Sequence, residues 1–167
     1  MRATRPFAAL AAAVLVLACG GGGSDGLGVQ EPPPPETTCP IPVAVASPTF
    51  REHILPVLRQ TCGANSAMSC HGTPSPRGHV SYAASLTASE IHAQLLAEPA
   101  NAPLDAGWRR IAPGDPARSW LLEKVTKDDP GGAGQAYGNR MPLGLPNLCA
   151  PTVETIRSWV AAGAKDD

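Results

Sequence analysis

The sequence predicts an all-α domain of about four short helices, which are joined by long loops rich in glycine and proline. Three observations favour this fold class. Apolar residues recur at helical spacing in four segments, most of these segments begin with a helix-start signal, and no stretch alternates as a β-strand does. The predicted domain occupies residues 47–167.

The first predicted helix begins at Ser47-Pro48, where a capping residue precedes a proline at the first helical position. The apolar residues that follow share one helical face: Phe50, Ile54, Val57 and Leu58. Pro56 lacks a backbone N–H, so we expect this helix to kink or restart there.

The second and third predicted helices each open with a recognisable cap. Thr87 and Glu90 have the spacing of a capping box, and Ile91 and Leu95 follow on one face. Asp115-Pro116 pairs a cap with a proline, ahead of three apolar residues: Trp120, Leu121 and Val125.

The fourth predicted helix begins near Pro151 and stops at Gly163. Three long loops with poor periodicity separate the helices, at residues 61–86, 98–114 and 128–150. Such loops are rare in a compact domain unless something organises them. We therefore expect disulfide bonds or a bulky buried cofactor to complete a thin apolar core.

The amino-acid composition limits which kinds of partner molecule are expected. Charged residues are 16% of the 167-residue chain, which argues against a highly charged disordered polypeptide. The net charge is −1, and removal of residues 1–46 leaves 11 basic and 11 acidic residues. A neutral body without a basic stripe argues against nucleic acid as a partner.

The N-terminal residues 1–18 have the layout of a secretory signal peptide. Arg2 and Arg5 precede an apolar run of about 12 residues, which is too short to span a bilayer. The run ends in Val16-Leu17-Ala18-Cys19, which resembles the lipobox of bacterial lipoproteins. The resemblance implies a diacylglycerol on Cys19, a membrane anchor, and a periplasmic or surface-facing position in the bacterial cell envelope. An ordinary signal cleavage near Ala18 is the alternative.

Residues 19–46 are predicted to form a flexible tether behind the lipidated cysteine. A glycine run at 20–23 favours a floppy chain, whereas the four prolines at 32–35 favour an extended one. A tether of this kind would hold the domain off the membrane while it searches for partners.

Four cysteines remain once Cys19 is set aside: Cys39, Cys62, Cys70 and Cys149. An even number in an oxidising compartment allows three disulfide pairings. Cys70 directly precedes His71, which is half of the C-x-x-C-H signature for covalent haem attachment. In that chemistry two thiols add to the haem vinyl groups, and the adjacent imidazole coordinates the iron.

The spacing departs from that signature. The usual first cysteine would lie at position 67, which is Ala67, and the nearest upstream thiol is Cys62. The pattern is therefore C-x7-C-H, and the inserted residues would have to bring both sulfurs to the porphyrin edge.

Met141 is the predicted distal ligand of the iron. It lies in a glycine-rich loop after Arg140, in a chain with only three methionines. His/Met ligation is the electron-transfer arrangement of cytochromes c. His79 or His92 in its place would give a bis-His haem of lower potential, and Met68 is too close in sequence to His71 to reach the opposite face.

The ordered set of motifs resembles a bacterial cytochrome c-like domain of the planctomycete type, which occurs in exported proteins and lipoproteins. The resemblance covers about residues 48–165 and depends on motifs in the following segments: 54–58, Cys62, 70–72, 113–119, 140–142 and 156–164. It implies one covalent haem c, with His71 proximal, Met141 distal, and Cys62 and Cys70 as thioether donors. Cys39 and Cys149 are then left to form a disulfide, because the first and last helices of such domains cross and pack.

The expected function is that of a membrane-anchored electron carrier, not an enzyme, whose partners are exported redox proteins. A peroxidase would need an open distal site, for which Arg140 is the one hint. The alternative is a haem-free surface lipoprotein stapled by disulfides Cys62–Cys70 and Cys39–Cys149, which acts as a binding module. Zinc at Cys62, Cys70 and His71 is a third arrangement.

Overall fold

The computed structural model describes residues 39–63, 70–72, 79–97, 102, 107–132, 134 and 136–167. These residues belong to a compact unit that begins at Pro33, and the preceding unit, Met1–Pro32, is outside the described residues. The predicted signal peptide, the lipidation site Cys19, tether residues 19–38 and Met68 are therefore also outside them.

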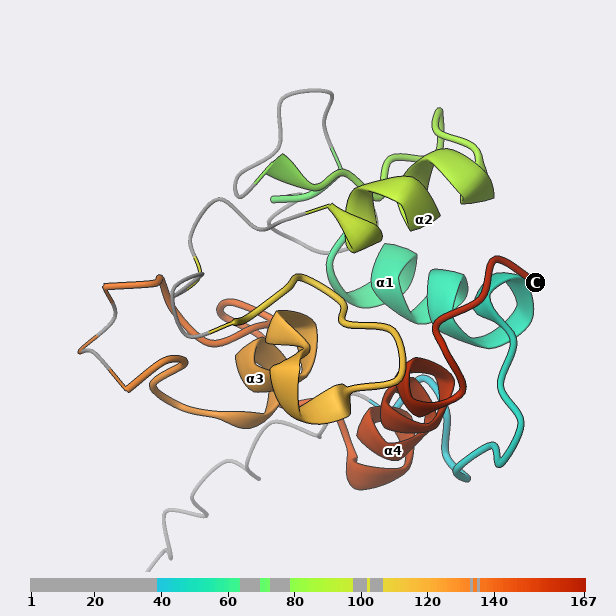
Figure 1. The fold of residues 1–167 in the computed structure, drawn as a ribbon. Coiled ribbons are helices and arrows are strands. Elements are labelled where there is room, and N and C mark those ends of the chain that lie inside the picture. Colours follow the sequence, from blue (N-terminus) through green and yellow to red (C-terminus); the bar gives the residue numbers. More distant parts are fainter. Residues whose placement is uncertain are drawn as a thin grey trace, which may run out of the picture. The chain divides into compact units, whose positions relative to one another are not determined.

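The described residues form four α-helices and two other helical turns, with no β-strand among them (Figure 1). In chain order these elements are η1 (Phe50–Ile54, a π-helical turn), α1 (Leu55–Thr61), α2 (Ala88–Leu96), η4 (Pro116–Arg118, a 3-10 turn), α3 (Trp120–Thr126) and α4 (Ala150–Ala161). The predicted all-α class with four short helices is thereby confirmed.

The first helix differs from its prediction at one end and agrees with it at the other. It begins at Phe50 after an extended Thr49, so the predicted start at Ser47-Pro48 is wrong. The Thr49 N–H instead donates to Nδ1 of His53, 3.2 Å away. The predicted change in the helix at Pro56 is present as a change of type, because the backbone stays helical through Ile54 and passes from π to α geometry at Leu55, just before Pro56.

The other predicted helix caps are present, but one of them caps a different element from the one expected. Thr87 and Glu90 form a reciprocal capping box at the start of α2. The Asp115 side chain accepts from two backbone N–H groups but caps η4, so α3 starts later, at Trp120. Pro151 lies in the first turn of α4, as predicted.

The core lies where η1 and α3 pack against α4, and side chains of α1 and α2 complete it. Its largest fully buried side chains come from the first and last helices, from α2 and, in one case, from the loop before η4: Trp159, Phe50, Ile54, Leu58, Ile91, Leu95, Ile111 and Ile156. The Phe50 and Trp159 rings stack with their centroids 5.5 Å apart. Aromatic stacking between the first and last helices therefore fixes how these two elements lie against each other.

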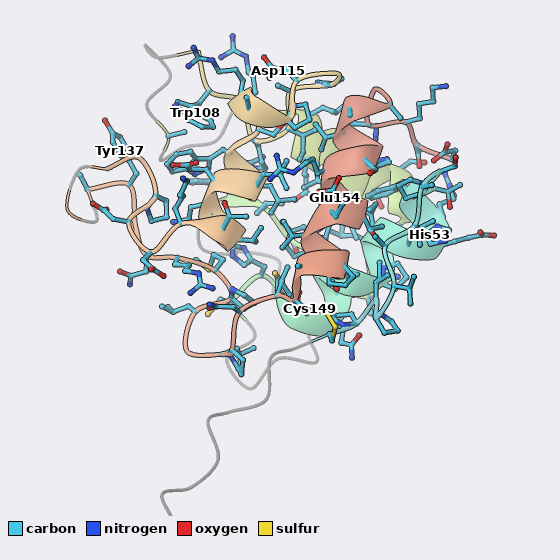
Figure 2. The ribbon with its side chains drawn as sticks, turned by 90° about the horizontal axis from the view of Figure 1, so that it is seen from below. His53, Trp108, Asp115, Tyr137, Cys149 and Glu154 are labelled. Atoms are coloured by element: carbon cyan, nitrogen blue, oxygen red, sulfur yellow. A yellow bond between two sulfur atoms is a disulfide. The ribbon has the colours of Figure 1, made fainter. Side chains whose placement is uncertain are left out.

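A disulfide joins Cys39 to Cys149, immediately before α4 (Figure 2). The pairing predicted from the family resemblance is therefore confirmed. Two hydrogen bonds continue the contact along α4, because the Ile41 N–H donates to Thr152 Oγ1 at 3.2 Å and the Val45 N–H donates to Thr155 Oγ1 at 3.0 Å. Residues 39–46, which the sequence assigned to the tether, thus lie against the last helix.

The C-terminal residues close over the start of η1. The N–H groups of Phe50 and Arg51 donate to Asp167, each at 2.9 Å. These groups open the helix and lack partners within it, so Asp167 acts as a cap supplied from the far end of the sequence. Asp166 accepts from Ser89 Oγ at 2.6 Å and pairs with Arg51 at 3.0 Å.

Asp166→Asn should destabilise the domain slightly at neutral pH and not at all in acid. The hydrogen bond from Ser89, followed by the Arg51 and His92 charges, lowers the pKa of the Asp166 carboxyl below its usual value, so its ionised form stabilises the folded state. That contribution is present above the unfolded-state pKa and is lost as the pH falls through the folded-state pKa. Because the pair is exposed, we expect a loss of at most about 1 kcal/mol at pH 7.

The check is urea unfolding of both proteins at about pH 7 and about pH 2.5, where the difference in unfolding free energy should vanish. Glu154→Gln removes the same charge from a pair with Arg157 within α4 and should stay within about 0.5 kcal/mol of the parent. A difference that persists unchanged in acid would refute the assignment.

Candidate functional site

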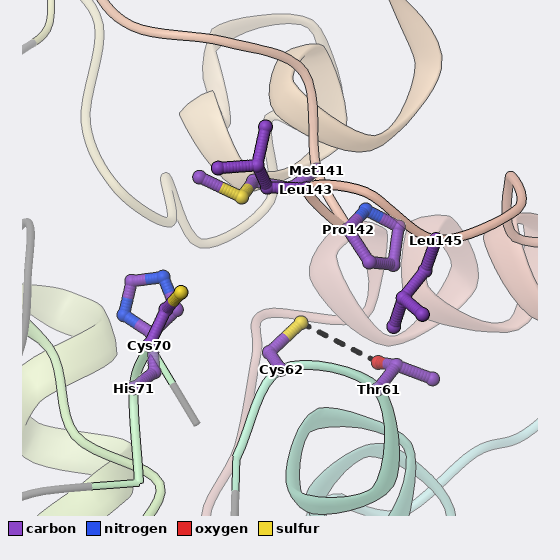
Figure 3. A pocket seen from close by; sticks show the side chains of 8 residues that line it. All are labelled: Thr61, Cys62, Cys70, His71, Met141, Pro142, Leu143 and Leu145. Atoms are coloured by element: carbon purple, nitrogen blue, oxygen red, sulfur yellow. Dashed lines mark hydrogen bonds between the residues drawn. The ribbon is translucent and has the colours of Figure 1, made fainter. Parts of the chain in front are cut away.

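A pocket with an empty volume of about 270 Å³ lies between the end of α1 and two loops (Figure 3). It is lined by Thr61, Cys62, Cys70, His71, Met141, Pro142, Leu143 and Leu145. The structure thus brings the four predicted haem-binding residues, Cys62, Cys70, His71 and Met141, to one space, although the sequence separates the first from the last by a large part of the domain.

His71 is held by the segment that follows it in the described chain. Its Nδ1 lies 2.9 Å from the Val80 carbonyl oxygen, and its own carbonyl accepts from the Tyr82 N–H at 2.6 Å. The Tyr82 ring lies 5.5 Å from the imidazole ring between centroids. Since a carbonyl can only accept, Nδ1 carries the proton and Nε2 has its lone pair free for coordination.

The surroundings of His71 favour the neutral imidazole. Burial lowers the pKa of His71, the hydrogen bond to Val80 opposes this shift, and the positive charges of Arg110 and Lys124 lower the pKa further. A neutral imidazole is the form that binds a metal.

Cys62 occupies the C-terminal end of α1. Its N–H donates to the Leu58 carbonyl at 2.9 Å, and its Sγ lies 3.4 Å from Thr61 Oγ1. Burial raises the pKa of the Cys62 thiol, while the Thr61 hydroxyl opposes this shift. Cys62 and Cys70 are both free thiols, so the Cys62–Cys70 disulfide of the alternative prediction is not formed in the structure.

Met141 enters the pocket from a loop that is attached to α3. Its N–H donates to the Lys124 carbonyl at 2.8 Å, and a cis peptide bond leads to the buried Pro142. Leu143 and Leu145 continue this apolar wall. Figure 3 shows Met141 and His71 on separate loops that border the same space.

The described residues do not support a metal site whose ligands all come from protein side chains. Within the described ranges, no three His, Cys, Asp or Glu side chains are grouped closely enough to hold a metal ion. The zinc arrangement at Cys62, Cys70 and His71 is therefore not formed. A haem iron differs in that the porphyrin supplies four ligands and the protein only the axial ones.

The residues around the pocket fit a c-type haem in their chemistry. Two free thiols, an imidazole with Nε2 available and a thioether border an apolar wall. The empty volume of the pocket includes open solvent, and the space for water-sized molecules is only about 20 Å³, so the walls must part to admit a macrocycle. Apart from Thr61, the lining residues lie in loops or at a helix cap, and the walls can move without breaking a helix.

The alternative distal ligands are placed elsewhere. His92 Nε2 bonds to the Ala164 carbonyl at 2.7 Å and packs against Phe50. His79 is exposed, and neither histidine is among the described residues that line the pocket.

Two cations near the pocket were not predicted from the sequence. Arg110 is 6% exposed and donates to the Gln94 carbonyl, and Lys124 is half-buried on α3. Both are close enough to act electrostatically on His71. No sequence motif marks them, because their position depends on how the loop before α3 packs.

Among the described residues, no helix is long and apolar enough to cross a membrane. Comparisons with known proteins found no matching family model, no similar curated protein and no similar solved structure.

Proposed function

We propose that this protein is a membrane-anchored c-type cytochrome domain that carries single electrons through one covalently attached haem. The observation that carries the proposal is that Cys62, Cys70, His71 and Met141 line one pocket. The pairing of Cys39 with Cys149 adds support, because it leaves the two pocket cysteines as free thiols.

Each of the four residues has a distinct role in this proposal. Cys62 and Cys70 supply the thioether sulfurs, and His71 Nε2 and the Met141 sulfur are the axial ligands. When bound, the haem supplies a one-electron iron couple, whose potential a thioether ligand raises. The Val80 carbonyl orients the His71 ring and stabilises the tautomer that coordinates through Nε2.

The remaining pocket residues favour an electron carrier over an enzyme. Pro142, Leu143 and Leu145 form an apolar wall that would exclude water from the iron. Arg140, the candidate distal group of a peroxidase, instead pairs with Asp128 at 3.1 Å. On the Met141 side of the pocket, the described lining residues include no acid or base that could activate a bound oxidant.

The proposed setting is the bacterial cell envelope, with a lipid on Cys19 and exported redox proteins as partners. Because Cys39 is bonded to Cys149, the proposed tether is shortened to residues Cys19 to Thr38. At roughly 3 Å per residue this segment would reach some tens of ångströms from the membrane.

The test is expression of the full chain with and without a haem-attachment system. With it, the purified protein should gain the mass of one haem and show a c-type spectrum when reduced. Replacement of both Cys62 and Cys70 with alanine should abolish the haem spectrum that survives denaturation, because one thioether bond alone would keep the haem attached. Cys39→Ala, which removes a cysteine outside the pocket, should not abolish it.

A colourless product would overturn the proposal. If its peptide map also showed Cys62 bonded to Cys70, the disulfide-stapled surface lipoprotein would take its place. The iron content of the matured protein distinguishes the two at once.

A further inference from the structure

Lys124 attaches the Met141 loop to α3 through two different groups. Its backbone carbonyl accepts from the Met141 N–H at 2.8 Å, and its Nζ donates to the Tyr137 carbonyl at 3.1 Å. One residue therefore holds the loop both at Met141 and four residues before it.

The backbone contact follows from where α3 ends. The helix stops at Thr126, so the Lys124 carbonyl is among the last four, which have no partner within the helix. The Met141 N–H satisfies this acceptor. The side-chain contact is independent of it, because it depends on the ammonium group.

The ammonium group is fixed in place by its surroundings. It lies 5.8 Å from the centroid of the Trp120 ring, which is 5% exposed. Gly138 has φ +80° and passes so close that a Cβ there would lie 3.3 Å from Nζ. The Tyr137 ring also packs edge-on against Trp120, at 6.1 Å between centroids. The loop is thus held against a buried surface.

The neighbouring ion pair is a weaker restraint. Arg140 bonds to Asp128 at 3.1 Å, but the Asp128 side chain is 96% exposed. A solvent-exposed pair of this kind contributes little. Of these two restraints on the loop, the hydrogen bonds of the half-buried Lys124 are therefore the stronger.

We infer that Lys124 is a positioning residue that keeps the Met141 sulfur at the iron of the attached haem. The inference rests on the proposed function. The hydrogen bond from the charged Nζ opposes release of the loop, and its loss should raise the fraction of molecules in which Met141 is detached from the iron.

The test is imidazole binding to the ferric holoprotein, in which imidazole competes with Met141. Lys124→Met keeps the aliphatic stem on Trp120 but removes the donor, and should tighten imidazole binding about tenfold. The sulfur-to-iron charge-transfer band should weaken and the reduction potential should fall, while the haem mass is unchanged. Met141→Ala removes the sulfur ligand, so its spectrum defines complete loss of the band.

Lys127→Met is the matched control, since Lys127 is exposed just after α3, and it should leave imidazole affinity within about twofold of the parent. Unchanged imidazole affinity and an unchanged band in Lys124→Met would overturn the inference. If Lys124→Met does not fold, Lys124→Arg retains a charged donor and should bind imidazole as the parent does. If neither variant folds, Lys124 is a structural requirement and the inference also fails. A parent protein without haem would instead refute the proposed function.

Discussion

Replacement of both Cys39 and Cys149 with serine should lower the free energy of unfolding by about 4 kcal/mol. The bond joins residues 110 apart, so in the chain-entropy account its removal releases almost the whole domain in the unfolded state. Domains of this size have only about 5–15 kcal/mol of stability. The loss should therefore lower the melting temperature by roughly 10–20 °C.

Urea unfolding with and without a reductant measures this effect. Reductant should destabilise the parent to the level of the double variant, because Cys39 is exposed, and should leave the double variant unchanged. The hydrogen bonds of Ile41 and Val45 to α4 should weaken as the segment detaches. A parent whose urea midpoint does not respond to reductant would contradict the prediction.

Trp159→Ala should cost about 3–5 kcal/mol, which is the range for an aromatic residue truncated in a core. Trp159 is 1% exposed, stacks on Phe50, and lies 6.2 Å from the His92 ring between centroids. Its Nε1 also donates to the Lys165 carbonyl at 3.0 Å, which holds the C-terminal segment to α4. The variant thus loses packing between the first and last helices together with one hydrogen bond.

Trp108→Ala is the matched control for this core substitution. Trp108 is half-buried and meets Trp120 edge-on at 5.5 Å between centroids, so the same truncation should cost clearly less. Chemical unfolding of the two variants side by side gives the comparison. Equal losses would mean that the contact between η1 and α4 is not the centre of the core.

The helix starts show which features of this fold can be predicted from neighbouring residues. The capping box at Thr87, the change in the helix at Pro56 and the proline that opens α4 are satisfied by neighbours in sequence, and all three were predictable. The beginning of η1 was not, because its first N–H groups are capped by Asp167 from the other end of the chain. A cap of this kind leaves no pattern in nearby residues.

The same distinction applies to the pocket. Cys70-His71 and Met141 were recognisable as motifs, whereas the part played by Cys62 depended on a spacing that departs from the usual signature. The structure places Cys62 at the end of α1 beside the other three, which no count of intervening residues could establish. Lys124 and Arg110 have no motif, since their proximity to His71 arises only from packing.

The hydrophobic core cluster and the pocket lining share no residue in the described chain, and Cys62 and Met141 pack against that cluster. Under the proposed function, helix packing and haem attachment depend on separate sets of side chains. The expected consequence is that the helical core can form before the haem is attached, so that an apoprotein made without porphyrin is a folded precursor.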